Sequence, residues 1–131
     1  MEEIRYCAEC GTSYWIEDHH IIRKSQVKPL DKCPGNHVDL CNIHHRDHSN
    51  GIHFNRELDR KYRLKFQNWL EMRLLKNEYE LEEIQDVLQI SFNATKNLCK
   101  LMTLQKGKYI RENIIRTCMG GKMVLEGETN E

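Results

Sequence analysis

The 131-residue sequence lacks the features that mark exported and membrane-spanning proteins. Its first residues, MEEIRYC, contain no basic region followed by an apolar run, so we expect no signal peptide. No apolar stretch approaches the roughly 20 residues that a helix needs to cross a bilayer. We therefore expect a cytoplasmic protein that has no membrane partner.

Net charge is also missing, because 20 Lys and Arg residues balance 20 Asp and Glu residues. The overall charge gives no sign of a nucleic-acid partner, but its distribution does. Residues 78–90 carry five acids and no base, whereas residues 91–122 carry seven bases and one acid. This asymmetry predicts an electropositive surface on the C-terminal half.

Histidine and cysteine are concentrated near the N-terminus. All seven histidines lie between His19 and His53, and four of the six cysteines lie between Cys7 and Cys41. A disulfide framework would need an export signal, so the Cys7-x2-Cys10 spacing favours metal binding. A chain this short buries a modest core, and a bound ion would help to stabilise its first half.

Two chelating pairs are separated by a loop-sized segment: Cys7 with Cys10, and Cys41 with His44. Three sulfurs and one nitrogen form a ligand set that structural zinc prefers, so we predict a structural Zn²⁺ here. Cys33 competes for a place among the ligands. Cys99 and Cys118 lie at helical positions far along the chain, where we expect small core residues.

Short strands are expected around the adjacent histidines, because residues 14–16 and 21–22 favour β-structure and residues 38–41 suit a second strand. Residues 24–36 hold both prolines and are expected to form a loop. A helix is predicted from an N-cap at Asn55 to about Asn77. Its apolar face comprises Leu58, Tyr62, Phe66 and Trp69.

Three further helices are predicted in the C-terminal part. The first two are separated by a turn at Gln89 and Ile90, and Ser91 is the expected N-cap of the second. The third runs from about residue 108 to 118, before Gly120 and Gly121. The apolar stripes of the first two helices are Leu81, Ile84, Val87 and Leu88, and then Ala94, Leu98, Leu101 and Met102.

A second group of chemically active residues begins with DHHIIR at residues 18–23 and continues with Asn36 and His45. Adjacent residues on a strand point to opposite faces, so His19 and His20 can serve one site only if the strand end bends. With such a bend, one histidine could bind a metal ion and the other could act as a base near neutral pH. A pair of surface histidines is the alternative.

The pattern CxxC, DHHII, N-x4-C-x2-H-H and GIH, over about residues 7–66, resembles the HNH (ββα-metal) endonuclease family, in particular its small phage-type members. The most specific element is the register, since Asn36 precedes Cys41 by five residues and His45 by nine. The resemblance implies an α+β fold, in which a zinc-stapled ββα-metal nuclease core precedes a helical part. It also implies hydrolysis of phosphodiester bonds in DNA.

The resemblance implies a role for each residue of the second group. His19 and His45 would be ligands of the catalytic metal ion. His20 would be the general base that activates water, and Asn36 would brace the loop and orient that base. Imidazole ligands favour Mn²⁺, Ni²⁺ or Zn²⁺ over Mg²⁺, and the sequence leaves these four ions open.

The sequence departs from the commonest family pattern at three places. His44 replaces a fourth cysteine, which a zinc site tolerates. Arg23 stands where proline is common and, with Lys24, would place positive charge near the scissile phosphate. A serine stands at the usual place of the final histidine, so His53 is the favoured third ligand and His48 is the alternative.

The stretch ELEEIQDVLQISFNATKNLCKLM resembles a helix-turn-helix. Residues 91–101 would be the recognition helix, because Asn suits base edges and Lys suits phosphates. The side chains expected to contact DNA are Asn93, Lys96, Asn97 and Lys100. An ordinary helical hairpin with a solvated charged face is the alternative.

These inferences divide the chain into a zinc-bound nuclease core at residues 1–56, a long helix at 57–77, a helical DNA-binding part at 78–122 and a polar tail at 123–131. The favoured function is a metal-dependent endonuclease. A rival is a non-catalytic zinc-binding helix-turn-helix protein, such as a regulator or inhibitor, which would not need the second group. A third is a nuclease that works only with phage packaging or recombination proteins, in the host cytoplasm.

Overall fold

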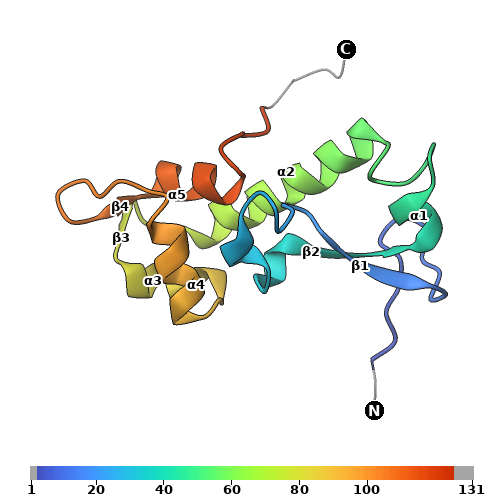
Figure 1. The fold of residues 1–131 in the computed structure, drawn as a ribbon, viewed down its shortest axis with the longest axis horizontal. Coiled ribbons are helices and arrows are strands. Elements are labelled where there is room, and N and C mark those ends of the chain that lie inside the picture. The colour runs from blue at the N-terminus through green and yellow to red at the C-terminus, as the bar shows by residue number, and fades with distance from the viewer. Residues whose placement is uncertain (1–2, 126–131) are drawn as a thin grey trace.

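A computed structural model describes residues 3–125 as a small α+β protein with two two-stranded sheets and five α-helices (Figure 1). No helix in this described part is both long and apolar enough to span a membrane. The elements in chain order are β1 Ile16–His20, the 3₁₀ turns η1 Lys28–Leu30 and η2 Pro34–Asn36, β2 His37–Cys41, α1 Asn42–Arg46, α2 Arg56–Arg73, β3 Glu78–Tyr79, α3 Leu81–Leu88, α4 Phe92–Cys99, β4 Tyr109–Ile110 and α5 Arg111–Cys118.

The first sheet pairs β1 with β2 in antiparallel register, from Ile16↔Cys41 to His20↔His37. The strand expected at residues 38–41 is confirmed, whereas the earlier strand differs from the expectation of residues 14–16 and 21–22. Trp15 has a φ of 51°, which interrupts the extended backbone just before β1. The strand therefore contains the histidine pair itself instead of flanking it.

The long helix α2 begins at its predicted N-cap, where the Asn55 side chain accepts a hydrogen bond from the Leu58 amide at 3.1 Å. It ends at Arg73 and not near Asn77. The physical reason is a cap from a distant segment. Arg111 donates to the carbonyl oxygens of Leu74 at 2.6 Å and of residue 71 at 2.9 Å, which satisfies acceptors at the helix end.

The predicted pair of C-terminal helices is confirmed as α3 and α4. Gln89 turns the chain with a left-handed φ of 56°, and the Ser91 hydroxyl caps α4 by accepting from the residue-94 amide at 3.1 Å. Helix α4 ends at Cys99, so Leu101, which was predicted to belong to its apolar stripe, lies beyond the helix and is 61% exposed. The last helix begins at Arg111 and not near residue 108, because residues 109–110 pair with β3 as a strand.

One hydrophobic core joins the N-terminal and C-terminal halves. Helix α4 packs against η1, while α2 packs against η2 and α5. Cys99 and Cys118 are buried in this core, as predicted. The helical half thus supports the loop between β1 and β2 directly.

Gly35 allows the closest approach between that loop and α2. A Cβ atom at this position would overlap the indole ring of Trp69. Only a residue without a side chain lets η2 lie flat against the helix. This contact holds the adjacent Asn36 in place.

We predict that Gly35→Ala lowers the free energy of unfolding by about 1–3 kcal/mol, because the added methyl group overpacks the contact with Trp69. Urea unfolding measures the loss. In a Trp69→Leu background the same substitution should cost less, since the two effects share one contact. An equal cost in both backgrounds would show that the indole ring is not what restricts residue 35.

Candidate metal centres

The first candidate centre joins both predicted chelating pairs. Cys7 and Cys10 lie in an N-terminal turn, Cys41 ends β2 and His44 lies in α1. Their four ligand atoms lie within 4.8 Å of one another and could hold a metal ion. His44 Nδ1 is 3.3 Å from Cys41 Sγ and 3.7 Å from Cys7 Sγ, and the Cys10 and Cys41 sulfurs are 3.8 Å apart.

The surroundings of Cys7 favour the thiolate, which is the form that binds metal. Burial raises the pKa of the Cys7 thiol, but hydrogen bonds from the backbone at Cys41, Cys10 and Glu9 bring that pKa down to about 6. Cys33, the competing ligand, lies outside the cluster in the core, where burial raises its pKa to about 11. The structure thus separates the four clustered residues from the buried thiol.

We expect the cluster to hold one tightly bound ion per chain, with zinc favoured by its three sulfurs and one nitrogen. Removal of this ion should unfold residues 1–55, because binding energy at a structural metal site is folding energy. Elemental analysis of protein purified without added metal measures the content. The Cys41→Ser variant should lose one equivalent of bound metal per chain, whereas the Cys33→Ala variant should keep it. A folded wild-type protein without this ion would contradict the prediction.

The second candidate centre is a triad of His19, His45 and His53, whose ligand atoms also lie within 4.8 Å of one another. His19 comes from β1, His45 from α1, and His53 from the loop before α2. The Nε2 atoms of His45 and His53 are 3.0 Å apart. His19 Nε2 is buried and has no hydrogen-bond partner among the described residues. Such an orphaned nitrogen, facing two other imidazoles, fits a metal ligand.

The electrostatics of the triad keep a lone pair available for a metal ion. Burial, followed by the nearby His45 and His53, lowers the pKa of His19 to about 4. His45 Nδ1 donates to a Glu17 carboxylate oxygen at 2.8 Å, which leaves its Nε2 as the acceptor. A carboxylate behind a ligating histidine is a common way to fix the ring. The three imidazoles can therefore coordinate a divalent cation.

A chain reversal after α1 places His53, and not His48, beside His19 and His45. The Asp47 carboxylate accepts from the backbone amides of residues 49 and 50, and the Ile52 amide donates to the carbonyl of residue 44 at 2.8 Å. This turn carries His53 back to His45. His48 instead stacks on the ring of residue 54, with centroids 4.5 Å apart, and lies outside the triad.

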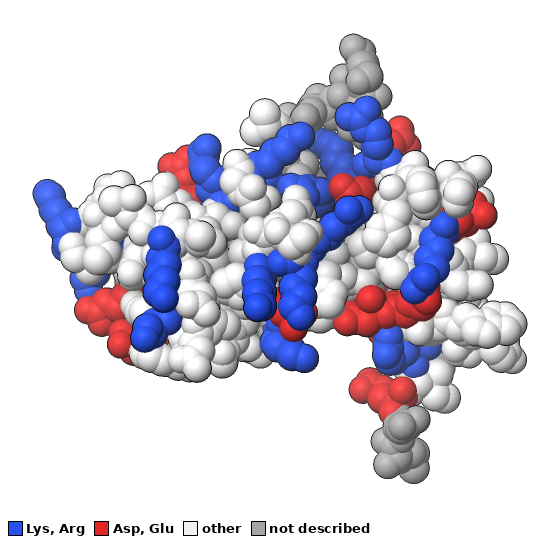
Figure 2. Space-filling model, in the orientation of Figure 1, with Lys and Arg blue, Asp and Glu red and all other residues white. Residues whose placement is uncertain are grey.

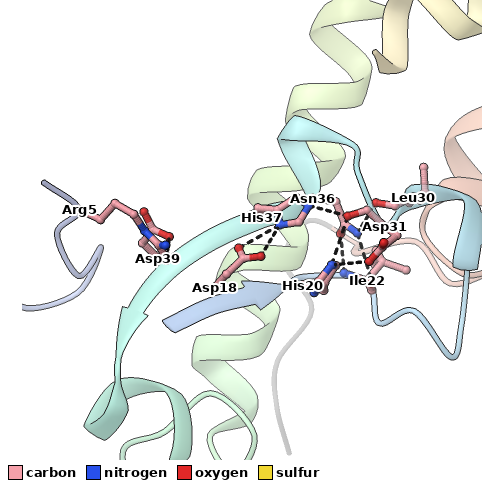
Figure 3. A network of polar contacts seen from close by, with 9 residues as sticks. All are labelled: Arg5, Asp18, His20, Ile22, Leu30, Asp31, Asn36, His37 and Asp39. Carbon is pink, nitrogen blue, oxygen red and sulfur yellow. Dashed lines mark hydrogen bonds and ion pairs between the residues drawn. The ribbon is translucent and has the colours of Figure 1, made fainter. Parts of the chain in front are cut away.

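His20 faces a different set of residues from His19. Its Nε2 lies 2.9 Å from Asp31 Oδ1 and 3.2 Å from the Asp31 carbonyl oxygen (Figure 3). The bend that would bring both histidines into one ligand cluster is not found within residues 3–125, because β1 stays paired with β2 through His20↔His37. Strand alternation therefore places the two side chains on opposite sides.

His37 is a member of this polar network that sequence reasoning missed. Its Nδ1 lies 2.9 Å from the Asp18 carboxylate and its Nε2 lies 2.7 Å from the Asp31 carbonyl oxygen, while the centroid of its ring lies 4.5 Å from that of His20. The potential ligand atoms of Asp18, His20 and His37 also lie within 4.8 Å of one another. Hydrogen bonds already engage both nitrogens of His37 and Nε2 of His20, so the group resembles a positioning network. The available signal was the position of His37 directly after Asn36.

Asn36 braces the loop between β1 and β2. Its side-chain oxygen accepts from the Ile22 amide at 2.6 Å, and its side-chain nitrogen donates to the carbonyls of Ile22 at 3.0 Å and Leu30 at 3.1 Å. The side chain is fully buried, so water cannot replace these bonds. Asp31 directly follows Leu30, which links the brace to the partner of His20 (Figure 3).

Asn36→Ala should lower the free energy of unfolding by at least about 2 kcal/mol, because it leaves three buried backbone groups without a partner. The exposed Asn93→Ala is the matched control and should stay within about 0.5 kcal/mol of wild type. Thermal or urea unfolding measures both. Equal stability of the two variants would mean that the loop does not depend on the buried amide.

The residues predicted to contact DNA lie on two separate surfaces. Arg23 and Lys24 are exposed after β1, and Arg23 donates to His53 Nδ1 at 3.2 Å. Asn93, Lys96 and Lys100 are exposed on or just after α4. Helices α4 and α1 lie toward opposite ends of the long axis (Figure 1). The structure brings Arg23 to the triad and leaves the α4 residues apart from it.

No family model, curated protein or solved structure matches the chain. The geometry of these side chains and the motifs that contain them are therefore what point to a function.

Proposed function

We propose that this protein is a metal-dependent endonuclease of the HNH type, which hydrolyses phosphodiester bonds in DNA. The observation that carries the proposal is the buried Nε2 of His19, which has no hydrogen-bond partner within residues 3–125 and faces His45 and His53 beside the cluster of Cys7, Cys10, Cys41 and His44. A protein that needed only a structural zinc ion would have no use for this second group of ligands. The order of two paired strands and a short helix also supports a ββα-metal core.

In this proposal the triad holds one divalent cation. Three protein ligands leave places for oxygen atoms of the substrate, and imidazole favours Mn²⁺, Ni²⁺ or Zn²⁺ over Mg²⁺. Such an ion would stabilise negative charge on a phosphate oxygen and on the leaving oxygen. Glu17 orients His45 through the 2.8 Å hydrogen bond to its Nδ1, so a ligand of the ion has a fixed ring position.

His20 is proposed as the general base. Its Nε2 donates to Asp31, which leaves Nδ1 to accept a proton from water. The carboxylate fixes the tautomer and the ring plane, while Asn36 fixes the loop that carries Asp31. His19 and His20 lie on opposite faces of β1, so proton transfer by His20 at a phosphate bound by the triad requires the end of the strand to bend when substrate binds.

Arg23 has a part in the proposed mechanism. It donates to His53 Nδ1, which requires that nitrogen to be unprotonated. Coordination through His53 Nε2 would place the ring proton on Nδ1 instead. Arg23 would then lose its acceptor and be released to a phosphate oxygen of the substrate, with which a guanidinium forms strong hydrogen bonds.

A non-catalytic helix-turn-helix protein is the second candidate. The capped α3–α4 pair supports it, because α4 exposes Asn93 and Lys96 as a DNA-reading helix would. It offers no role for the histidine triad. Phage packaging or recombination proteins are proposed as further partners of the nuclease, and the plasmid-nicking assay separates the two candidates.

His20→Ala should lower the rate of plasmid nicking by on the order of a hundred- to ten-thousand-fold, because positioned acid–base catalysis contributes this much. His19→Ala should also be inactive, but through loss of the ion. Titration with Mn²⁺ or Ni²⁺ distinguishes the two, since only the His20 variant should bind the ion with near wild-type affinity. His48→Ala, outside both groups, is the control and should cleave normally.

The assay also tests the proposal as a whole. If wild-type protein does not nick plasmid in the presence of Mg²⁺, Mn²⁺, Ni²⁺ or Zn²⁺, the non-catalytic candidate is favoured. A His20→Ala variant that nicks at the wild-type rate would assign proton transfer to another group. Normal ion binding by His19→Ala would remove the triad from the mechanism.

A further inference from the structure

A cationic pocket lies beside the histidine triad. It has a volume of about 620 Å³ and is formed by the loop after β1, the first turns of α2 and the segment of residues 120–124. His53 belongs both to the triad and to the wall of this pocket. Lys and Arg side chains gather where α2 meets the C-terminal segment (Figure 2). The basic residues that line the pocket are Arg23, Arg56, Arg60, Arg63 and Lys122.

Within residues 3–125, basic side chains outnumber acidic ones in the lining of the pocket. Asp59 is the only acid in its lining, and none of the five basic residues forms an ion pair with a carboxylate within residues 3–125. Elsewhere on the surface, bases such as Arg46, Lys61 and Lys108 are paired with glutamates. Unpaired cations in a concave, partly enclosed place concentrate positive potential and attract anions.

Backbone carbonyl groups hold two of the pocket arginines, Arg60 and Arg63. Arg60 donates to the Leu125 carbonyl at 2.8 Å, and Arg63 donates to the carbonyls of Met119 and Lys122, each at 3.3 Å. Arg60 Nε is buried without a described hydrogen-bond partner. These contacts fix the guanidinium groups without neutralising them, and a guanidinium fork matches the geometry of a phosphate.

Three of the arginines form a row along α2. Arg56, Arg60 and Arg63 are spaced by four and three residues, which places them on one helical face. From Arg56 to Arg63 the helix rises about 10 Å, and one strand of DNA carries a charge about every 3.4 Å along the helix axis. The row is therefore long enough to meet more than one phosphate of the same strand.

We propose that the cationic pocket binds the phosphates that flank the scissile bond of a nucleic-acid strand, so that the strand runs from the triad along the first turns of α2. The inference deepens the proposed nuclease function and depends on it for the position of the scissile phosphate. It places the substrate path at the triad end of the molecule, on residues that the helix-turn-helix prediction does not include. Arg23 then connects the pocket to His53.

The test uses the salt dependence of binding. The probes are a fluorescein-labelled 20-base-pair DNA duplex and one of its single strands, titrated by anisotropy at several KCl concentrations. Wild-type protein as purified is used, with no divalent ion added, and gels confirm that the probes stay intact. Each phosphate contact contributes about 0.9 to the slope of log affinity against log salt for duplex DNA and about 0.7 for a single strand.

Arg56→Gln and Lys122→Gln should each lower the duplex slope by about 0.9, and the double variant should lower it by about 1.8. These residues suit the test because no ion pair or side-chain hydrogen bond of either one has to be broken within residues 3–125. Lys65→Gln is the matched control, since it removes an exposed charge from α2 outside the pocket and should leave the slope unchanged. A lower slope in both pocket variants, by about 0.9 with the duplex or by about 0.7 with the single strand, supports the proposal.

Wild-type slopes for both pocket variants would overturn the proposal, as would an equal loss in Lys65→Gln or a failure of wild type to bind either probe. Binding and cleavage are separate measurements. Lowered slopes in a protein that never cleaves would support the pocket and reject the nuclease function. Wild-type slopes in the pocket variants of a protein that cleaves DNA would reject the pocket but not the nuclease function. The strand would then lie elsewhere, and Lys96→Gln on α4 would be the next variant to test.

Discussion

The antiparallel pairing of β1 with β2 is the constraint on which the candidate site depends. Its register places His20 opposite His37 and leaves His19 on the buried side of the strand. The same register ends β2 at Cys41, so that α1 starts directly beside both groups of candidate metal ligands. Because side chains alternate along a strand, a slip of one residue would exchange the two faces and separate each group.

Helix α1 connects the two candidate metal centres. His44 joins the three cysteines, and the next residue, His45, joins His19 and His53. With neighbouring ligands in one short helix, the geometry of the cysteine-rich cluster sets the position of the triad. The N-terminal turn is tied to α2 as well, since Glu9 accepts hydrogen bonds from residues 61 and 62. A structural ion would thus stabilise the scaffold that positions the histidine triad.

Several parts of this arrangement could be predicted from sequence because their signals are local. The spacing of the two chelating pairs depends on a few neighbouring residues, and so do the helix caps at Asn55 and Ser91. The strands β3 and β4 could not be predicted, since residues 78–79 have strand structure only through pairing with residues 109–110. The early end of α2 has the same origin, because Arg111 caps it from a distant segment.

The available ligands and bases, and the local elements in which they lie, follow from the amino-acid sequence, because those properties depend on residues a few positions apart. Which of these residues meet depends on the fold. The return of the chain to His45 selected His53, and strand pairing separated His20 from His19 and placed it beside His37. The cationic pocket likewise exists only where α2 meets residues 120–124. Each of these contacts joins segments distant in sequence, and its energy depends on packing that no local pattern encodes.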